Sequence, residues 1–202
     1  MDTLSYIINK YGLAERVGKS PVEIEGVGRN DLARLFHELN FKVGVEIGVE
    51  RGEYTEVLCR ENPQAKIYAI DPWTAYRGYR DHVSQTKLDD FYASTLKRIN
   101  GYNCELIKDF SENAVHRFGD RSLDFVYVDG NHCFYNTTID IHLWYKKVRR
   151  GGILSGHDYR RTKNQAFQHV VDVVQGYTRA YRIEPWFVIR PGRSAPSWMW
   201  VV

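Results

Sequence analysis

Long apolar segments and cysteines are both scarce in this 202-residue chain, in which no apolar run approaches the ~20 residues that span a bilayer. The first ten residues include Asp2 and no long apolar stretch, so we expect no secretory signal. The three cysteines, Cys59, Cys104 and Cys133, match neither a zinc-finger spacing nor a disulfide framework. We therefore expect a cytoplasmic protein without a membrane partner.

An excess of one charge is also missing. The chain has 28 Lys and Arg against 25 Asp and Glu, a net charge of +3, and no dense basic stripe, which argues against a nucleic-acid partner. Hydrophobic residues make up 43% and charged residues 26%, which excludes a disordered or fibrous chain. What the chain does have is 14% aromatic residues, so rings either fill the core or line a site.

Beyond residue 40, short apolar runs alternate with segments long enough for helices. The runs predict strands at Val43–Ile47, Ile67–Ile70, Glu105–Ile107, Leu123–Val128 and Gly152–Leu154. The segments between them predict helices at Tyr54–Glu61, Thr86–Asn100, Ser111–Phe118 and Tyr135–Val148. This alternation is typical of a doubly wound, mostly parallel sheet with helices on both faces.

The two ends of the chain differ from this pattern. Residues 1–40 predict helices, and a further helix is expected near Thr162–Gln175. Two strands are expected after it, at Tyr181–Ile189 and Ser197–Val202. Proline and glycine between them predict a hairpin connection, which makes the last strand antiparallel. We therefore expect an α/β fold with a Rossmann-like, seven-stranded sheet.

The turn after the first of these five strands combines an acid with glycines. Glu46 precedes Gly48 and Gly52 at a strand-to-helix turn, where glycine either lets the backbone approach a ligand or simply makes a tight turn. A carboxylate at Glu46 repels phosphate but can receive an ammonium group. The pattern therefore favours an amino-acid-like ligand over a dinucleotide.

Acids also end the next two strands. Asp71 either accepts from both ribose hydroxyls of an adenosine or caps a turn, and Trp73 beside it either covers an adenine or packs in the core. Asp109, next to Phe110, either accepts from an adenine amino group or caps the following helix. Both positions are therefore candidates for an adenosine-binding site.

Two acids and two histidines follow the last two of these strands, Asp129 with His132 and His157 with Asp158. Because the carboxyl ends of neighbouring parallel strands lie at one edge of a sheet, we expect these four side chains to converge. Such a set suits a general base or a divalent-metal site. The alternative is that the second pair caps a helix and His132 is solvated.

Taken in order, these residues resemble a class I S-adenosylmethionine-dependent methyltransferase. The resemblance is carried by Glu46, Gly48, Gly52 and Thr55, by Asp71–Trp73, by Val128–His132, and by Arg150–Gly152 with Gly156–Tyr159. Within that superfamily the chain is similar to the small stand-alone group related to macrocin-type and catechol-type O-methyltransferases. The resemblance implies a methyltransferase domain at 41–202, preceded by a helical N-terminal extension at 1–40 that matches no motif.

The same resemblance implies a role for each position in binding S-adenosylmethionine. The methionine part would be held by Glu46, Gly48, Gly52 and Thr55, the ribose by Asp71, and the adenine by Trp73, Asp109 and Phe110. The catalytic residues would be Asp129, His132 and His157. These assignments follow from the family pattern and not from the spacing alone.

In metal-dependent relatives, an aspartate and an Asp-Asn pair bind magnesium at the two strand ends. Here Asp129, His157 and Asp158 fall on those positions, so the divalent metal would be Mg, Mn or Fe. The histidine puts magnesium in doubt because imidazole suits Mn, Fe or Zn better. A metal-free site with His132 or His157 as the base is the alternative.

We therefore expect methylation of a hydroxyl on a small molecule such as a sugar, natural product or phenolic compound. A nicotinamide-dependent oxidoreductase and a non-catalytic cofactor-binding protein are the competing interpretations. The aromatic and basic segment Trp73–His82 is longer than a plain connection and is expected to form either a lid or an exposed loop. The oligomeric state stays open, with a homodimer as one candidate.

Overall fold

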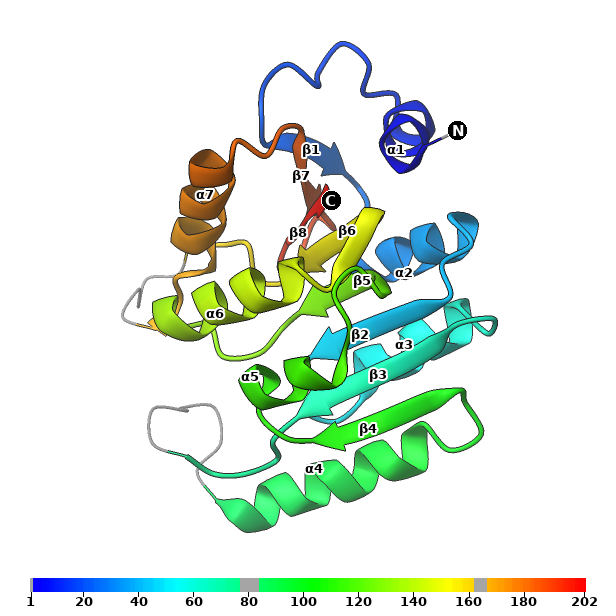
Figure 1. Ribbon diagram of the computed structural model, residues 1–202, viewed down its shortest axis with the longest axis vertical. Helices are drawn as coiled ribbons and strands as arrows, with labels where there is room; N and C mark the ends of the chain where they lie inside the picture. The colour runs from blue at the N-terminus through cyan, green and yellow to red at the C-terminus, as the bar shows by residue number, and fades with distance from the viewer. Residues whose placement is uncertain (1, 77–83, 162–166) are drawn as a thin grey trace.

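One eight-stranded sheet forms the centre of the molecule in the computed structural model, which describes residues 2–76, 84–161 and 167–202 (Figure 1). The strand order is β1-β7-β8-β6-β5-β2-β3-β4. The strands are β1 (Val22–Glu25), β2 (Val43–Ile47), β3 (Lys66–Asp71), β4 (Cys104–Lys108), β5 (Leu123–Val128), β6 (Val148–Gly156), β7 (Trp186–Arg190) and β8 (Ser197–Val201). Among them, β8 runs antiparallel to both of its neighbours, and the other pairs are parallel.

This sheet confirms the expected α/β class and the antiparallel last strand, but it corrects the strand count from seven to eight. The additional strand, β1, lies in the segment 1–40 that was expected to be helical. It pairs with β7 in the register Val22↔Phe187 and buries Val22 and Ile24. The strand is only four residues long, between Pro21 and Gly26, so its alternation is too brief to stand out from a turn.

Helices cover both faces of the sheet (Figure 1). They are α1 (Thr3–Tyr11), α2 (Arg29–Glu38), α3 (Glu53–Glu61), α4 (Gln85–Arg98), α5 (Ser111–Ala114) with a 3-10 turn (Val115–Arg117), α6 (Phe134–Tyr145) and α7 (Val170–Tyr181). The apolar residues of α1, α2 and α3 form one core cluster, and those of α6 and α7 form another. In the described part of the chain, no helix is long and apolar enough to cross a membrane.

Two of the C-terminal elements differ from their predicted bounds, whereas β8 begins at Ser197 as expected. Helix α7 starts at Val170 and continues to Tyr181, beyond the predicted end at Gln175, because Tyr177 and Thr178 extend its buried face. Strand β7 therefore starts at Trp186 rather than near Tyr181.

All five tryptophans of the chain are buried and therefore belong to the core. Trp144, Trp198 and Trp200 are fully buried, and Phe36 from α2 stacks on Phe125 from β5 with ring centroids 4.0 Å apart. This stack also joins the N-terminal segment to the core of the sheet. The division of the chain at residue 40 stays a prediction.

Candidate functional site

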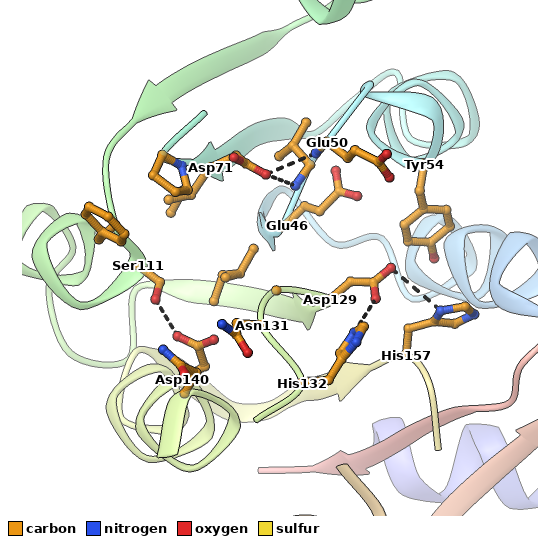
Figure 2. A pocket seen from close by; sticks show the side chains of 18 of the residues that line it. Glu46, Glu50, Tyr54, Asp71, Ser111, Asp129, Asn131, His132, Asp140 and His157 are labelled. Atoms are coloured by element: carbon orange, nitrogen blue, oxygen red, sulfur yellow. Dashed lines mark hydrogen bonds and ion pairs between the residues drawn. The ribbon is translucent and has the colours of Figure 1, made fainter. Parts of the chain in front are cut away.

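A cavity of about 340 Å³ opens at the carboxyl ends of β2, β3, β5 and β6 (Figure 2). In Figure 2, Ser111 and Asp140 lie at one side of it, Tyr54 and His157 lie at the opposite side, and Glu46 lies between them. Of the predicted site residues, the lining includes Glu46, Gly48, Asp71, Phe110, Asp129, His132, His157 and Asp158. The lining does not include Gly52, Thr55, Trp73 and Asp109.

Gly48 allows the turn after β2 to lie against the end of β5. Its φ is +85°, and a Cβ built there would stand 2.2 Å from the carbonyl oxygen of Asp129. No other residue type fits that approach without moving the backbone. Gly52 has a different place, because it is the N-cap of α3 and lies against Thr95.

Glu46 is a buried carboxyl group that faces the cavity and is 1% exposed. Burial raises its pKa well above the ordinary range, and the nearby Asp129 raises it further. The Thr55 hydroxyl, which donates a hydrogen bond to Glu46, and the charge of Arg29 act in the opposite direction. A cation entering the cavity would therefore favour the ionised form of this carboxyl.

The Asp71 carboxylate connects two turns at the cavity. It accepts hydrogen bonds from the backbone N–H groups of Val49 and Glu50, both at 3.0 Å, and from that of Trp73 at 2.8 Å. Trp73 itself is fully buried, and its Nε1 donates to the carbonyl of Glu50 at 2.8 Å. Asp71 thus lies at the cavity and also caps a turn, whereas the predicted contact between Trp73 and an adenine stays a prediction.

Asp140 is a buried carboxyl group that sequence reasoning missed. It projects from α6 into the lining, 4% exposed, and accepts a hydrogen bond from Ser111 (Figure 2). Burial raises its pKa to about 7. Phe110 also lines the cavity, whereas Asp109 accepts from the Phe110 N–H at 2.8 Å and from Asn113 at 2.9 Å. The N-cap of α5 is Phe110, without a side-chain cap hydrogen bond, so these bonds do not make Asp109 the helix cap, and its contact with an adenine stays a prediction.

The four acids and histidines at the ends of β5 and β6 come together as the topology predicts, and Figure 2 shows Asp129, His132 and His157 of this set. His132 Nε2 lies 3.5 Å from Asp129 Oδ1 and 3.4 Å from Asp158 Oδ2. His157 Nδ1 lies 3.7 Å from Asp129 and 3.8 Å from Asp158. One ligand atom each from Asp129, His132 and Asp158 lies within 4.8 Å of the others, a spacing that suits a metal ion. The histidine of that set is His132, and the predicted role of His157 as a metal ligand stays a prediction.

Two further lining residues come from outside the motifs. Arg29, at the start of α2, places its guanidinium over the Tyr54 ring at 4.9 Å, and Tyr76 contacts the Phe110 ring edge-on at 5.2 Å. Of the expected lid at Trp73–His82, the structure describes Trp73–Tyr76, and residues 77–82 lie outside the described residues. No local signal in the sequence marks Arg29, because only the packing of α2 brings it to the cavity.

Several known structures share this fold. An O-methyltransferase from Bacillus cereus in complex with SAH has a TM-score of 0.60 and 17% identity, with 99% of this chain and 90% of that chain covered. TomG from Streptomyces achromogenes, an O-methyltransferase of tomaymycin synthesis in complex with SAM, has a TM-score of 0.62 and 16% identity, with 100% and 90% covered. The SAH-bound methyltransferase PaMTH1 from Podospora anserina has a TM-score of 0.63 and 13% identity, with 86% and 78% covered. At these identities the likeness establishes the fold.

Sequence comparison adds the family. An uncharacterized protein of Acanthamoeba polyphaga mimivirus is 26% identical over 121 residues, which cover 57% of this chain and 51% of the relative. The chain therefore spans about half the length of that curated relative. The family described as a methyltransferase domain matches residues 45–159, from β2 to the end of the acid and histidine cluster. Because this match covers more than half of the chain, the protein belongs to the family of methyltransferase domains.

Proposed function

We propose that this protein transfers the methyl group of S-adenosylmethionine to a hydroxyl of a small-molecule acceptor. The observation that carries the proposal is a single cavity in which the buried Glu46 carboxyl lies near the cluster of Asp129, His132 and Asp158. Family membership supports methyl transfer. The names of the structural neighbours, two O-methyltransferases among them, support this cofactor and a hydroxyl acceptor.

The adenosine of the cofactor would occupy the side of the cavity toward Asp140, and its methionine part would lie at Glu46, in the middle of the cavity. Glu46, oriented by Thr55, suits the ammonium of the methionine part, and Gly48 lets the backbone approach it. Asp71 suits the ribose hydroxyls, because its carboxylate lines the cavity at the end of β3, where an acceptor can bind both hydroxyls. Phe110 suits the adenine face.

The acceptor hydroxyl would lie at the opposite side, next to His132. S-adenosylmethionine supplies a methyl group already activated on a sulfonium. The protein has to align the acceptor oxygen with it and remove the hydroxyl proton. His132 Nε2 takes that proton while the new O–C bond forms and the C–S bond breaks with its electron pair going to sulfur. Asp129 and Asp158 hold the resulting imidazolium between them.

A divalent ion held by Asp129, His132 and Asp158 is the second form of this site. Two carboxylates and an imidazole suit Mn or Fe better than Mg. Such an ion would orient the acceptor oxygen and lower its pKa. The two forms exclude each other, because an imidazole nitrogen that ligates a metal cannot also accept the proton. Metal analysis together with activity in a chelator separates them.

The decisive experiment compares ligands and then turnover. Calorimetry should detect binding of S-adenosylhomocysteine and not of NAD, because Glu46 faces the ligand where a pyrophosphate would lie. Release of S-adenosylhomocysteine is then measured with sugar, phenolic and polyketide hydroxyls as acceptors. His132→Ala should bind the product normally but lose turnover, whereas His116→Ala, at an exposed position away from the cavity, should keep it. Full turnover by His132→Ala would refute the assigned base.

The remaining parts of the proposal concern the cellular location, the partners and the oligomeric state of the protein. We propose a cytoplasmic location and no nucleic-acid partner, as the charge balance and the three free cysteines suggest. Cell fractionation tests the first point and a mobility-shift assay the second. Sedimentation velocity decides between a monomer and a homodimer.

A further inference from the structure

Arg29 is a cation in the cavity that no motif of the sequence explains. It is the first residue of α2, outside the segment that matches the family. Its side chain is 36% exposed and lines the cavity. Within the described residues, its guanidinium donates no hydrogen bond, and its ion pair with Asp129 spans 3.6 Å, beyond hydrogen-bond distance. A half-buried guanidinium fork with five N–H donors is therefore available to a ligand.

Tyr54 fixes the position of this cation from two sides. The Tyr54 hydroxyl donates to the backbone carbonyl of Arg29 at 2.7 Å. The face of the same ring lies under the guanidinium, 4.9 Å from its carbon. A planar cation stacked on a ring loses little freedom when it binds a ligand, so the fork is held ready for a planar anion such as a carboxylate.

Glu46 and Arg29 form a complementary pair around the cavity. The two groups are close enough for each charge to affect the pKa of the other, yet no ion pair joins them in the described structure. A free α-amino acid group carries its ammonium and its carboxylate on a single carbon. Such a group would place the ammonium at Glu46 and the carboxylate at Arg29, and would satisfy both with hydrogen bonds.

We infer that Arg29 binds the carboxylate of the cofactor's methionine part. This inference rests on the proposed function and deepens it, because it assigns a cofactor contact to the N-terminal segment, which lies outside the family match. Arg51, the other arginine in the lining, fits this role less well. It lies over the Phe91 ring at 4.4 Å and beside Glu50 at 3.8 Å, whereas Arg29 is the arginine among the main charges that act on the pKa of Glu46.

Two ligands that differ in the amino-acid part provide the test. S-adenosylhomocysteine carries the carboxylate, whereas 5′-methylthioadenosine has the same adenosine and lacks the amino-acid part. Calorimetry should show that Arg29→Gln lowers the affinity for S-adenosylhomocysteine by roughly 10- to 100-fold, the range for a lost charge-assisted hydrogen bond. The affinity for 5′-methylthioadenosine should fall by less than about threefold. Arg34→Gln is the matched control, since Arg34 lies on the same helix but pairs with Asp31 and Glu61.

Arg29→Lys provides a second variant if the glutamine variant fails to fold. Lysine keeps the charge but loses the planar fork, so the affinity for S-adenosylhomocysteine should fall less than with glutamine, and that for methylthioadenosine should again stay unchanged. Equal effects on the two ligands, or no effect on either, would overturn the inference, and an anion of the acceptor would then be the remaining candidate for Arg29. A wild-type protein that binds neither ligand would instead refute the proposed function.

Discussion

Replacing Asp140 with asparagine should stabilise the protein, and more so as the pH rises. The carboxyl group of Asp140 is buried in the lining of the cavity, and burial raises its pKa from 3.8 to about 7. The negative charge of Glu112 adds to this rise, and the Ser111 hydrogen bond partly offsets it. The nearby Tyr76, whose pKa is raised by burial and in part by the charge of Asp140, supplies no positive charge.

The magnitude follows from the linkage between proton binding and folding. Because the pKa is higher in the folded state, the folded protein holds the proton more tightly, and its stability falls as the pH rises from about 4 to about 7. The separation between the folded-state and unfolded-state pKa values of Asp140 corresponds to about 4 kcal/mol of unfolding free energy in total. Of this unfolding free energy, about 2.5 kcal/mol is lost between pH 5 and pH 8.

Asparagine at position 140 keeps the side-chain oxygen that accepts from Ser111 but cannot ionise. Between pH 5 and pH 8, the free energy of unfolding of the variant should therefore rise by about 2.5 kcal/mol relative to that of the wild type. For a chain of this size, this corresponds to a relative Tm shift of roughly 5–10 °C. Thermal unfolding of both proteins at the two pH values measures it, and all other titrating groups cancel in the comparison. Asp90→Asn, at an exposed position on α4, is the control. A difference in Tm that is the same at both pH values would refute the reasoning.

Three other substitutions test the cavity. Glu46→Gln should lower the affinity for S-adenosylhomocysteine roughly 10-fold or more. It should also abolish the proton release that accompanies binding to the wild type, which is measured from the buffer dependence of the calorimetric enthalpy. Gly48→Ala should destabilise the protein by roughly 1–3 kcal/mol or more through its clash with Asp129, whereas Gly176→Ala, in open space on α7, should stabilise it by roughly 0.5–1 kcal/mol. Trp73→Phe should lower Tm through its lost hydrogen bond and leave cofactor affinity unchanged; a large loss of affinity would instead support the adenine contact.

The parts of the fold that the sequence predicts best are the central strands. The predicted bounds of β2 and β5 coincide with the observed ones, because each is a short, mostly apolar run bounded by a polar residue or a glycine. β1 escaped prediction for the opposite reason, since a four-residue edge strand depends on its pairing with β7 more than on its own pattern. Local periodicity therefore predicts the buried strands and also β4 at the other edge of the sheet, but it misses an edge strand as short as β1.

The site shows the same contrast. Asp129, His132, His157 and Asp158 were predicted to converge because parallel strands of one sheet end at one edge, a rule that needs no side-chain detail. Arg29 and Asp140 reach the cavity from helices, and their approach depends on how α2 and α6 pack on the sheet. Helical residues such as these carry no strand-end signal in the sequence.

The charges of the cavity fit the proposed reaction before and after methyl transfer. The lining holds seven carboxyl groups and two arginines, an acidic excess that suits a cationic sulfonium. Transfer of the methyl group removes that positive charge, and proton transfer to His132 restores one between Asp129 and Asp158. The net charge inside the cavity is therefore conserved while its position changes.

The carboxylates beside His132 should act on the chemical step, so Asp158→Asn should lower kcat while S-adenosylhomocysteine binds as tightly as to the wild type. An equal loss in affinity would place Asp158 in cofactor binding instead.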